Sequence, residues 1–331
     1  MPDPRLDVLC IGNAIVDVIA DAGDDFLERE GLVKGSMRLV DAEEAERLYD
    51  HMGAGRQVSG GSAGNTAAGV AVLGGRAGFI GQVAPDPLGK FYRDDLTATG
   101  VEFITAAADV GAPTARSMIL VTPDGHRTMN TFLGAAQHLP ASALDETQIR
   151  DSAILYLEGY LWDPETPRYA MVRAIEVARE AGRKVAFTLS DTFCVDRHRA
   201  GFMQLLDTGR IDILFANQAE IEALAGVAHL ETAVAEIAPK VETLVVTRSE
   251  DGALAIRGGE RADVAAEPIR ELVDTTGAGD LFAAGFLLGA ARGESLDHSL
   301  RLGAICAAEV IQHYGARPEA DLRALAGDLI G

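Results

Sequence analysis

The chain has 331 residues, of which 48% are hydrophobic and 24% are charged, so it can bury a full core and resembles an ordinary soluble globular protein. Its formal charge of −21 repels phosphate backbones and anionic membrane surfaces, which argues against nucleic acid or a membrane as the main partner. A nucleotide ligand is still compatible with this charge, because backbone amides, helix N-termini and Mg²⁺ can hold phosphates in an acidic protein.

The N-terminal residues and the cysteines indicate a compartment. Residues 1–7 lack the basic region and apolar run of a signal peptide, and no later stretch holds about 18 uninterrupted apolar residues. Cys10, Cys194 and Cys306 are widely spaced, with no CxxC pair and no zinc-ligand spacing, and are interpreted as reduced thiols. We therefore expect a cytoplasmic protein.

Short apolar runs then alternate with longer amphipathic ones, a pattern typical of βα units around a largely parallel sheet. Two segments, 31–40 and 114–133, fit this rhythm poorly, since they mix apolar residues with turn formers as hairpins do. They are interpreted either as a small sheet that forms a lid or as surface hairpins. Strands are predicted at 8–12, 78–83, 153–157, 184–189, 211–216 and 244–247, and a clear amphipathic helix at 166–181.

The last third of the chain changes character. Residues 279–292, 296–313 and 318–330 are predicted to form successive helices with no strand between them, as a helical cap on the sheet would. No fixed-period repeat, low-complexity tract or Pro/Ser-rich linker divides the sequence. We therefore expect residues 1–331 to form a single large α/β domain, with a lid built from insertions at about 31–60 and 101–133.

The glycine-rich turn 274–280 (DTTGAGD), which leads into the apolar run 281–291, carries the strongest chemical signal. Its small residues leave successive amide N–H groups open at the start of a helix, where such donors lack intrahelical partners and the helix dipole favours an anion. Asp280, in the first turn, lies where a carboxylate could accept the proton of a hydroxyl that attacks a bound phosphoryl group. An ordinary helix start has the same local pattern, and neither GxxxxGK[ST] nor a GxGxxG turn after a strand occurs.

Three motifs in order resemble the ribokinase-like (PfkB) carbohydrate and nucleoside kinases. The first is residues 60–66 (GGSAGNT), similar to the substrate-binding glycine motif of that family. The second is residues 217–220 (NQAE), similar to the Asn-x-x-Glu motif that helps to organise Mg²⁺ and the ATP phosphates, although Asn at a strand end is also an ordinary N-cap. The third is residues 274–285 (DTTGAGDLFAAG), similar to the C-terminal signature. The resemblance implies a three-layer α/β sandwich with a mostly parallel central sheet and a small β lid.

Catalytic and nucleotide-binding roles follow from this resemblance. Asp280 matches the general base, and the amides of Gly277, Ala278 and Gly279 match the anion hole. Arg127 matches a lid arginine that reaches the transferring phosphate, with a solvated hairpin arginine as the alternative. The positions expected to bind ATP are Asn217, Glu220, Thr247, Ser249, Gly252 and Thr276.

The acceptor site resembles that of the adenosine kinase branch. Asp17, in residues 12–17 (GNAIVD), matches the residue that binds ribose hydroxyls, and a carboxylate accepts a hydrogen bond from each of two hydroxyls. Asn13, Gly61 and Asn65 are expected to contact the sugar as well. Met129, Thr131 and Leu133 match lid positions that line the base pocket, with packing inside the lid as the alternative.

The resemblance also implies ligands and leaves alternatives open. We expect ATP and Mg²⁺, with Glu220 acting on Mg²⁺ through water, and weak stimulation by K⁺ bound near Asp274 and the turn 315–317. Thr276 replaces the Asn usual in vertebrate-type adenosine kinases, and residues 61–65 lack a polar residue that often precedes the Asn. Both departures are shared with sugar kinases, so the sequence favours a purine nucleoside acceptor over a sugar only narrowly. A non-catalytic nucleoside-binding protein is the rival of another class, and a monomer or a homodimer is expected.

Overall fold

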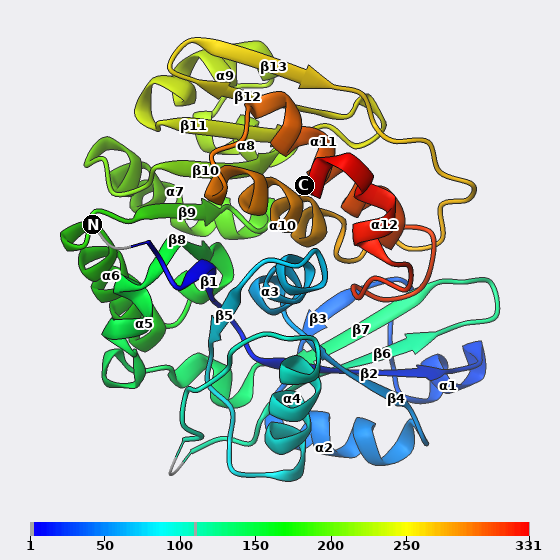
Figure 1. Cartoon of the computed structure of the whole chain (residues 1–331). Helices are drawn as coiled ribbons and strands as arrows, with labels where there is room; N and C mark the ends of the chain where they lie inside the picture. Colours follow the sequence, from blue (N-terminus) through cyan, green and yellow to red (C-terminus); the bar gives the residue numbers. More distant parts are fainter. Residues whose placement is uncertain (1–2, 109–110, 331) are drawn as a thin grey trace.

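The larger of two β-sheets forms the middle of the molecule. The structure, a computed structural model, describes residues 3–108 and 111–330, and in that part the sheet has eight strands in the order β13-β12-β11-β10-β9-β8-β1-β5 (Figure 1). From β11 to β5 the neighbouring strands are parallel, while β12 and β13 add an antiparallel hairpin at one edge. The strands are β1 Leu6–Ile11, β5 Ala77–Ile80, β8 Ser152–Glu158, β9 Lys184–Thr188, β10 Ile213–Asn217, β11 Thr243–Thr247, β12 Ala253–Arg257 and β13 Glu260–Val264.

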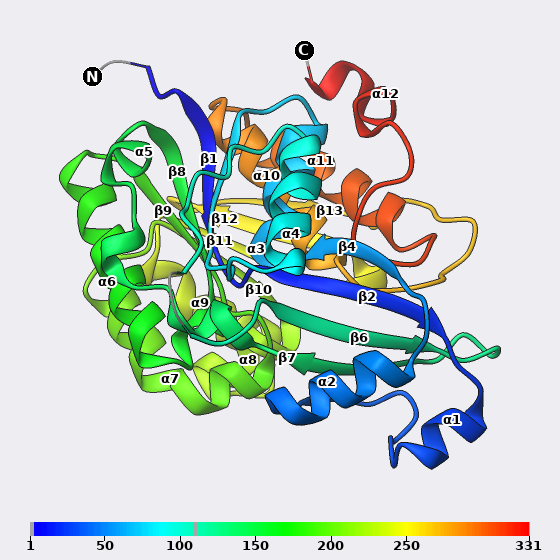
Figure 2. The same cartoon turned by 90° about the horizontal axis from the view of Figure 1, so that it is seen from below.

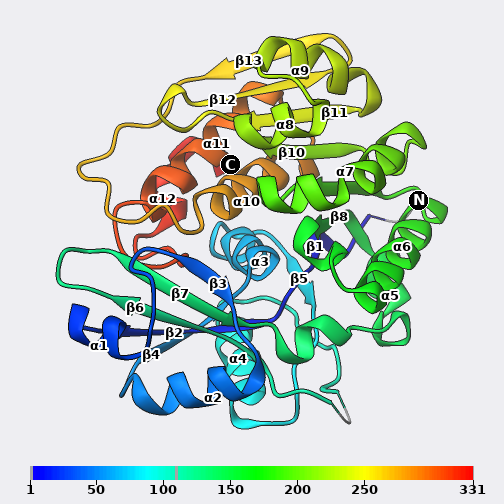
Figure 3. The same cartoon turned by 180° about the vertical axis from the view of Figure 1, so that it is seen from behind.

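Helices cover both faces of this sheet, and they pack through two separate apolar cores. Side chains alternate along β1: Val8 and Cys10 join the core beneath α3, α10 and α11, whereas Leu9 and Ile11 join the core beneath α6, α7 and α8. Figure 1 shows the first group in front of the sheet and Figure 3 shows the second. The first group is α3 Ser62–Val72, α10 Ala278–Ala291 and α11 Leu296–Val310; the second is α5 Glu146–Arg150, α6 Glu165–Glu180, α7 Thr192–Asp207, α8 Gln218–Ala225 and α9 Leu230–Ile237.

The predicted α/β class and three-layer architecture are confirmed. Each predicted strand overlaps an observed one, with ends that agree within two residues except at 78–83, where β5 already ends at Ile80. The helix predicted at 166–181 is α6. The predicted helical cap corresponds to α10, α11 and the short α12 Leu322–Ala326. The β12–β13 hairpin was not predicted. The remaining single turns are 3-10 helices at Gly134–His138, Ala141–Ala143, Gly159–Trp162, Ala238–Lys240, Ser249–Asp251 and Gly327–Ile330.

Small residues allow α3 and α10 to cross at close range. A Cβ added at Gly69 of α3 would lie 2.7 Å from Ala284 Cβ and 2.8 Å from Leu281 Cδ1, both on α10. A Cβ at Gly285 of α10 would likewise lie 2.6 Å from the backbone of Leu302 in α11. Since dense packing forbids such contacts, glycine at these positions sets how near the helices lie.

The second, smaller sheet lies beyond the carboxyl end of β1, since the chain enters β2 only three residues after β1 ends (Figure 2). Its order is β3-β7-β6-β2-β4, and β6 and β7 form the antiparallel hairpin expected within 114–133. Its strands are β2 Ile15–Asp21, β3 Met37–Leu39, β4 Arg56–Gly60, β6 Ala115–Val121 and β7 Arg127–Phe132.

The second sheet differs from the expectation in two respects. Residues 31–40 form no hairpin; they supply the single strand β3, which pairs in parallel with β7. The sheet also includes β2, which lies outside the insertions at 31–60 and 101–133. Helices α1 Asp24–Arg29 and α2 Ala42–His51 flank this sheet, and α4 Pro87–Ala98 packs on β4 and β2.

Two further features concern the described residues. Among them, no helix combines the length and the apolar character that crossing a membrane requires. Cys10, Cys194 and Cys306 are buried thiols that form no disulfide.

Candidate active site

The N-termini of α3 and α10 converge on one carboxylate, that of Asp280. Ser62 Oγ, at the start of α3, donates a hydrogen bond of 2.6 Å to Asp280, and Asn65 Nδ2, one turn later, donates one of 2.9 Å. Burial raises the pKa of Asp280 above its ordinary value, although these two donors act in the opposite direction. The side chain is only partly covered, so it combines raised basicity with access to a reactant.

The turn that precedes α10 presents free amide groups. Gly277 is the N-cap with φ of 80°, a left-handed conformation that glycine adopts without strain, and an added Cβ would lie 2.5 Å from Ala316 Cβ. Ala278 N–H donates to the Thr275 carbonyl at 3.2 Å, so this predicted member of the anion hole is engaged. Among the described residues, the amides of Gly277, Gly279 and Asp280 donate to no protein group. These three donors are free to bind an anion.

Asp274 ties this turn to the second sheet and to the C-terminal segment. Its carboxylate accepts hydrogen bonds from Thr276 N (3.0 Å), Thr276 Oγ1 (2.8 Å) and Gly315 N (2.9 Å), and it pairs with Arg127. Burial alone would raise the pKa of Asp274, but these hydrogen bonds lower it below its ordinary value. Four donors fill the acceptor capacity of a carboxylate, so this geometry weighs against K⁺ at Asp274, and K⁺ binding stays an untested expectation.

Arg127, in the second sheet, contacts the turn 274–280 that precedes α10. Its Nη1 donates to Thr276 Oγ1 at 2.7 Å as well as to Asp274, while its Nε and Nη2 are buried and lack a partner among the described residues. Unpartnered buried guanidinium donors are costly, so they indicate that an anion is needed here to complete the hydrogen bonding. Arg127 therefore lies beside the turn 274–280, and its contact with a transferring phosphate stays a prediction.

Glu158, which the sequence analysis did not single out, lies at the heart of the site. It ends β8, is fully buried, and accepts hydrogen bonds from Asn13 N (2.8 Å), Asn13 Nδ2 (2.7 Å) and Ala63 N (2.8 Å). Burial raises the pKa of Glu158 to about 7, against those three donors. A Cβ at Gly12 would lie 2.3 Å from the Glu158 carboxylate, so glycine at this position makes room for it. The detectable signal was a carboxylate placed directly after a buried apolar strand.

Arg317 is a second residue whose importance was missed. Its guanidinium donates to the Gly64 carbonyl at 3.1 Å, to Ser59 Oγ at 2.9 Å and to the Ser59 carbonyl, and so joins the C-terminal segment to β4 and α3. Burial lowers the pKa of Arg317, and nearby acidic groups that include Asp17 and Asp280 oppose this. No local sequence pattern around residue 317 reveals this contact, because its partners are more than 250 residues away.

The second sheet turns one face toward this region. Strand pairing places Asp17, Ser117 and Thr131 in one row across β2, β6 and β7, and it places Ile19, Ile119 and Met129 in the adjacent row of the same face. The first row is polar and its Ser117 and Thr131 hydroxyls are 2.9 Å apart, whereas the second is apolar. Burial raises the pKa of Asp17 to about 7, although Arg127 and Arg317 oppose the shift.

The other predicted acceptor residues lie close to this face. Asp17 and Asn65 line the same cavity of about 10 Å³, roughly the size of one water molecule. Asn65 Oδ1 is buried there without a partner in the described chain. Gly61, with φ of 85°, is the N-cap of α3, and an added Cβ would lie 2.0 Å from the Asn13 carbonyl oxygen. Leu133 is half-buried just past the end of β7.

Five of the six residues predicted to bind the nucleotide lie at or just after the carboxyl ends of β10 and β11, where Asn217 and Thr247 are paired neighbours. The sixth, Thr276, lies in the turn before α10, beside Asp274 and Arg127. Asn217 and Glu220 form a reciprocal capping box at the start of α8, with Asn217 Nδ2 donating to Glu220 at 2.6 Å. Burial raises the pKa of Glu220 to about 7. Ser249 and Gly252 shape the tight turn after β11, both at positive φ of 51° and 83°. These residues lie at the same edge of the sheet as Glu158.

Comparison with known proteins identifies the family of this chain. Residues 6–322 match the pfkB family carbohydrate kinases. The adenosine kinase from Sinorhizobium meliloti is 48% identical, with 97% of this chain and 98% of that chain covered and a TM-score of 0.90. A probable sugar kinase protein from Rhizobium etli CFN 42 is 47% identical, with 98% of both chains covered and a TM-score of 0.90. Adenosine kinase from Saccharomyces cerevisiae is 27% identical, over 93% of this chain and 95% of that protein.

The fold, the converging helix N-termini and these similarities lead to one assignment: the chain belongs to the pfkB family of carbohydrate kinases and is an ATP-dependent kinase with a ribokinase-like fold.

Proposed function

We propose that this kinase phosphorylates the primary hydroxyl of a purine nucleoside. The observation that supports the proposal most is the position of Asp280, which lies between the free amides of the α10 turn and the polar groups Ser62 and Asn65 of α3. A base in this place is close to both reactants, because the amides suit a phosphate and the α3 groups face the acceptor side.

In the proposed reaction Asp280 removes the proton from the acceptor hydroxyl as its oxygen attacks the γ-phosphorus of ATP. A new phosphorus–oxygen bond forms, the bond to the bridging oxygen breaks, and ADP leaves with those electrons. The free amides of Gly277 and Gly279 and the unpartnered donors of Arg127 stabilise the charge on the phosphoryl oxygens. Because Asp280 must be ionised to act, turnover rises with pH as this carboxyl, whose pKa is raised by burial, loses its proton.

Mg²⁺ fits the residues at the ATP end of the site. No cluster of three or more ligating side chains occurs in the described chain, and Mg²⁺ in kinases is commonly bound by one or two carboxylates together with substrate phosphates. We assign this role to Glu220, in the first turn of α8 directly after β10, acting through water. When bound, Mg²⁺ neutralises phosphate charge; Asn217 holds the Glu220 side chain in position.

The acceptor class is argued from the second sheet. Asp17 and the unpartnered Asn65 Oδ1 suit the hydroxyls of a sugar ring, and the apolar row that contains Ile119 and Met129 suits a flat base. A cavity of about 10 Å³ is far smaller than a nucleoside needs, so the second sheet must move outward for the acceptor to enter. A sugar acceptor is the second candidate, favoured by the polar row of Asp17, Ser117 and Thr131.

The test is ADP release measured with purine nucleosides and with free hexoses and pentoses, in the presence of Mg²⁺. We expect kcat/KM to be highest with a purine nucleoside and 5′-phosphorylated product to form. A higher kcat/KM for a free sugar than for any nucleoside would contradict the nucleoside proposal and identify a sugar kinase instead. Saturable nucleoside binding without ADP release would contradict the proposed chemistry at Asp280.

A further inference from the structure

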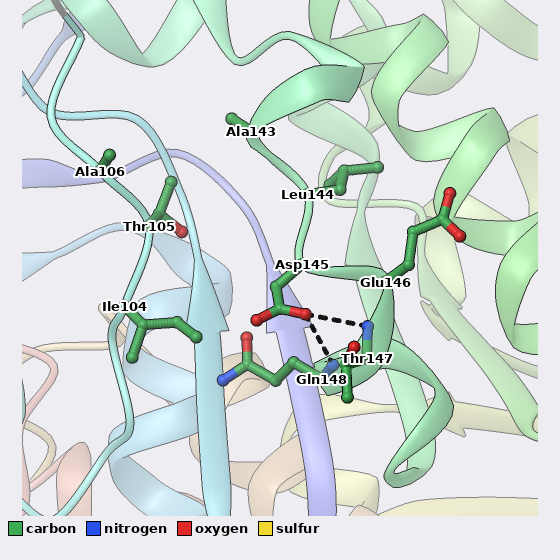
Figure 4. Close-up of a pocket in the computed structure, with 9 residues that line it drawn as sticks. All are labelled: Ile104, Thr105, Ala106, Ala143, Leu144, Asp145, Glu146, Thr147 and Gln148. Atoms are coloured by element: carbon green, nitrogen blue, oxygen red, sulfur yellow. Dashed lines mark hydrogen bonds between the residues drawn. The ribbon is translucent and has the colours of Figure 1, made fainter.

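A cavity of about 480 Å³ lies outside the active site, between residues 104–106 and residues 143–148 (Figure 4). The first segment follows α4 and the second leads into α5, and Ala143 and Leu144 of the second segment pack on the face of the main sheet opposite α3 and α10. None of the residues assigned above to ATP or the acceptor lines this cavity. Its volume is within the range of sites that bind small organic molecules.

Two buried oxygens in the cavity lack hydrogen-bond partners. Thr105 is 4% exposed and Gln148 is 1% exposed, yet Thr105 Oγ1 and Gln148 Oε1 are unpartnered among the described residues. The Gln148 carboxamide is held in one orientation, because its Nε2 donates to Glu102 at 3.0 Å and a flipped amide would place oxygen against that carboxylate. Both oxygens therefore need a donor from a ligand or from water.

Asp145 adds a negative charge to the same lining. One of its oxygens accepts from Thr147 N (2.9 Å) and Gln148 N (3.2 Å), which caps α5, and Figure 4 shows the carboxylate facing the end of the Gln148 side chain. Within the described chain Asp145 takes part in no ion pair, whereas the neighbouring Glu146 pairs with Arg150 and Arg173. The lining thus combines three acceptor oxygens, one of them on a carboxylate that forms no ion pair in the described chain, although Arg5, which pairs with Glu102, also attracts Asp145 over a longer distance.

We propose that this cavity binds a small organic cation, with an ammonium group directed at Thr105, Gln148 and Asp145. An ammonium group carries three donors and a positive charge, which matches three acceptors of which one is anionic. The exposed side chain of Ile104, together with Leu144, offers apolar contact for an aliphatic body. A bare metal ion does not match, since the space is far larger than one ion and no cluster of ligating side chains lies there in the described part.

The ligand should also lack a carboxylate. An amino acid would place its own negative charge near Asp145 and Glu146, and like charges in a partly enclosed space repel. Diamines and related aliphatic amines fit the lining best. This proposal is independent of the acceptor and of the chemistry at Asp280, because the cavity shares no residue with the active site.

The test is isothermal titration of the full-length protein with 1,4-diaminobutane, with 1,4-butanediol as an uncharged ligand of similar length. About 0.15 M salt screens the diffuse attraction that a chain of charge −21 has for any cation. We expect saturable binding of one diamine per chain and none of the diol. Lack of saturable diamine binding, or equal binding of the diol, would overturn the proposal.

Two matched variants locate the site. Asp145→Asn removes the charge but keeps an N-cap, since Asn caps helices as well as Asp does, and we expect it to weaken diamine binding about tenfold or more. Asp321→Asn is the control, because Asp321 caps α12 through the same pattern, accepting from Arg323 N (3.0 Å) and Ala324 N (3.2 Å), far from the cavity in sequence. Thr105→Val, which removes the hydroxyl while keeping the shape, should weaken binding as well. Unchanged affinity in both Asp145→Asn and Thr105→Val would overturn the site.

Discussion

The helices α3 and α10 begin in similar ways but treat charge differently. Each starts at a positive-φ glycine, Gly61 with φ of 85° and Gly277 with φ of 80°, and each is followed by small residues. At α3 the chain supplies its own anion, because Ala63 N–H donates to the buried carboxylate of Glu158. At α10 the amides of Gly277, Gly279 and Asp280 have no protein partner in the described residues.

This difference separates a structural helix start from one that can bind a ligand. A helix N-terminus attracts an anion whether or not the chain provides one. At α3 the carboxylate is part of the fold, and its burial raises the pKa of Glu158 to about 7. At α10 the free donors are available for the phosphoryl group that we propose to bind here, and Asp280 joins the two helices through its hydrogen bonds with Ser62 and Asn65. Four experiments test this assignment, in order of decreasing expected effect.

Asp280→Asn should lower kcat by about 10²-fold or more, since a positioned base typically contributes that much. Asn keeps the size of the side chain and can still accept from Ser62 through its oxygen, and its NH2 group can donate to the unpartnered Asn65 Oδ1 once the Asn65 amide turns over. The fold and the thermal unfolding midpoint should therefore change little. Steady-state kinetics and a thermal melt measure both effects. Near-normal turnover in a folded variant would exclude Asp280 as the base.

Glu158→Gln tests the start of α3, where the chain's own carboxylate accepts the Ala63 amide. The pKa of Glu158 in the folded chain, about 7, lies above the ordinary 4.5, so the folded state holds this proton more tightly than the unfolded state does. Stability from this group is therefore greatest below pH 4.5 and is lost as the pH rises through about 7. The variant should remove a fall of roughly 2 kcal/mol between pH 5 and 8, measured by urea unfolding.

The matched control for this slope is Glu236→Gln, on the exposed side of α9. This variant should leave the pH dependence of the unfolding free energy as it is in the parent chain. Burial also raises the pKa values of Asp17 and Glu220 to about 7, but these two groups contribute equally in the parent chain and in Glu158→Gln. The difference between the two slopes therefore reports Glu158 alone. An identical slope in Glu158→Gln and the parent would show that Glu158 does not carry this proton.

Asp17→Asn should raise the KM for the acceptor about tenfold while kcat changes less, because the proposed role is to accept hydrogen bonds from hydroxyls of the bound sugar. Asp21→Asn, at the exposed end of the same strand, is the control and should leave the KM unchanged. The measurement is initial-rate kinetics over a range of acceptor concentrations. An unaltered KM in Asp17→Asn would remove this residue from the acceptor site.

Gly277→Ala and Gly279→Ala are compared for their effect on the unfolding free energy, which is the smallest expected effect. At Gly277, alanine would have to adopt positive φ and approach Ala316, so unfolding free energy should fall by about 1–2 kcal/mol. At Gly279 an added Cβ meets nothing within 4 Å, and the same change should alter stability by no more than about 0.5 kcal/mol. Chemical denaturation compares them. Equal losses would show that backbone conformation does not limit this turn.

Much of the fold could be predicted because parallel strands buried on both faces are continuous apolar runs, as at 153–157 and 213–216. The second sheet was harder. β2 has a short alternating pattern that its motif residues obscure, and β3 is only three residues long. The β12–β13 hairpin did leave a signal, the pair Gly258-Gly259 between two short alternating segments, with φ of 56° and 90°.

The site was predictable where function lies in a local turn and not where it depends on distant contacts. The small side chains of Gly277, Ala278 and Gly279 indicate accessible amides in the turn, and Asp280 follows them directly. Glu158 and Arg317 act through partners that lie 95 or more residues away, so neither their burial nor their hydrogen bonds could be inferred from neighbouring residues. The collapsed cavity beside Asp17 likewise depends on how the two sheets pack.

The crossing of α3 and α10 at Gly69 has a consequence for the distance between the reactants. Ser62 and Asn65 lie in the first turns of α3, and Asp280 lies in the first turn of α10. The close approach of the two helices, set by Gly69 against Ala284, therefore fixes the distance between the proposed acceptor site and the proposed phosphate site. An added methyl group at Gly69, more than a turn along α3 from Asn65, would force α3 away from α10 and so separate Asp280 from Ser62 and Asn65, without changing any of these three residues.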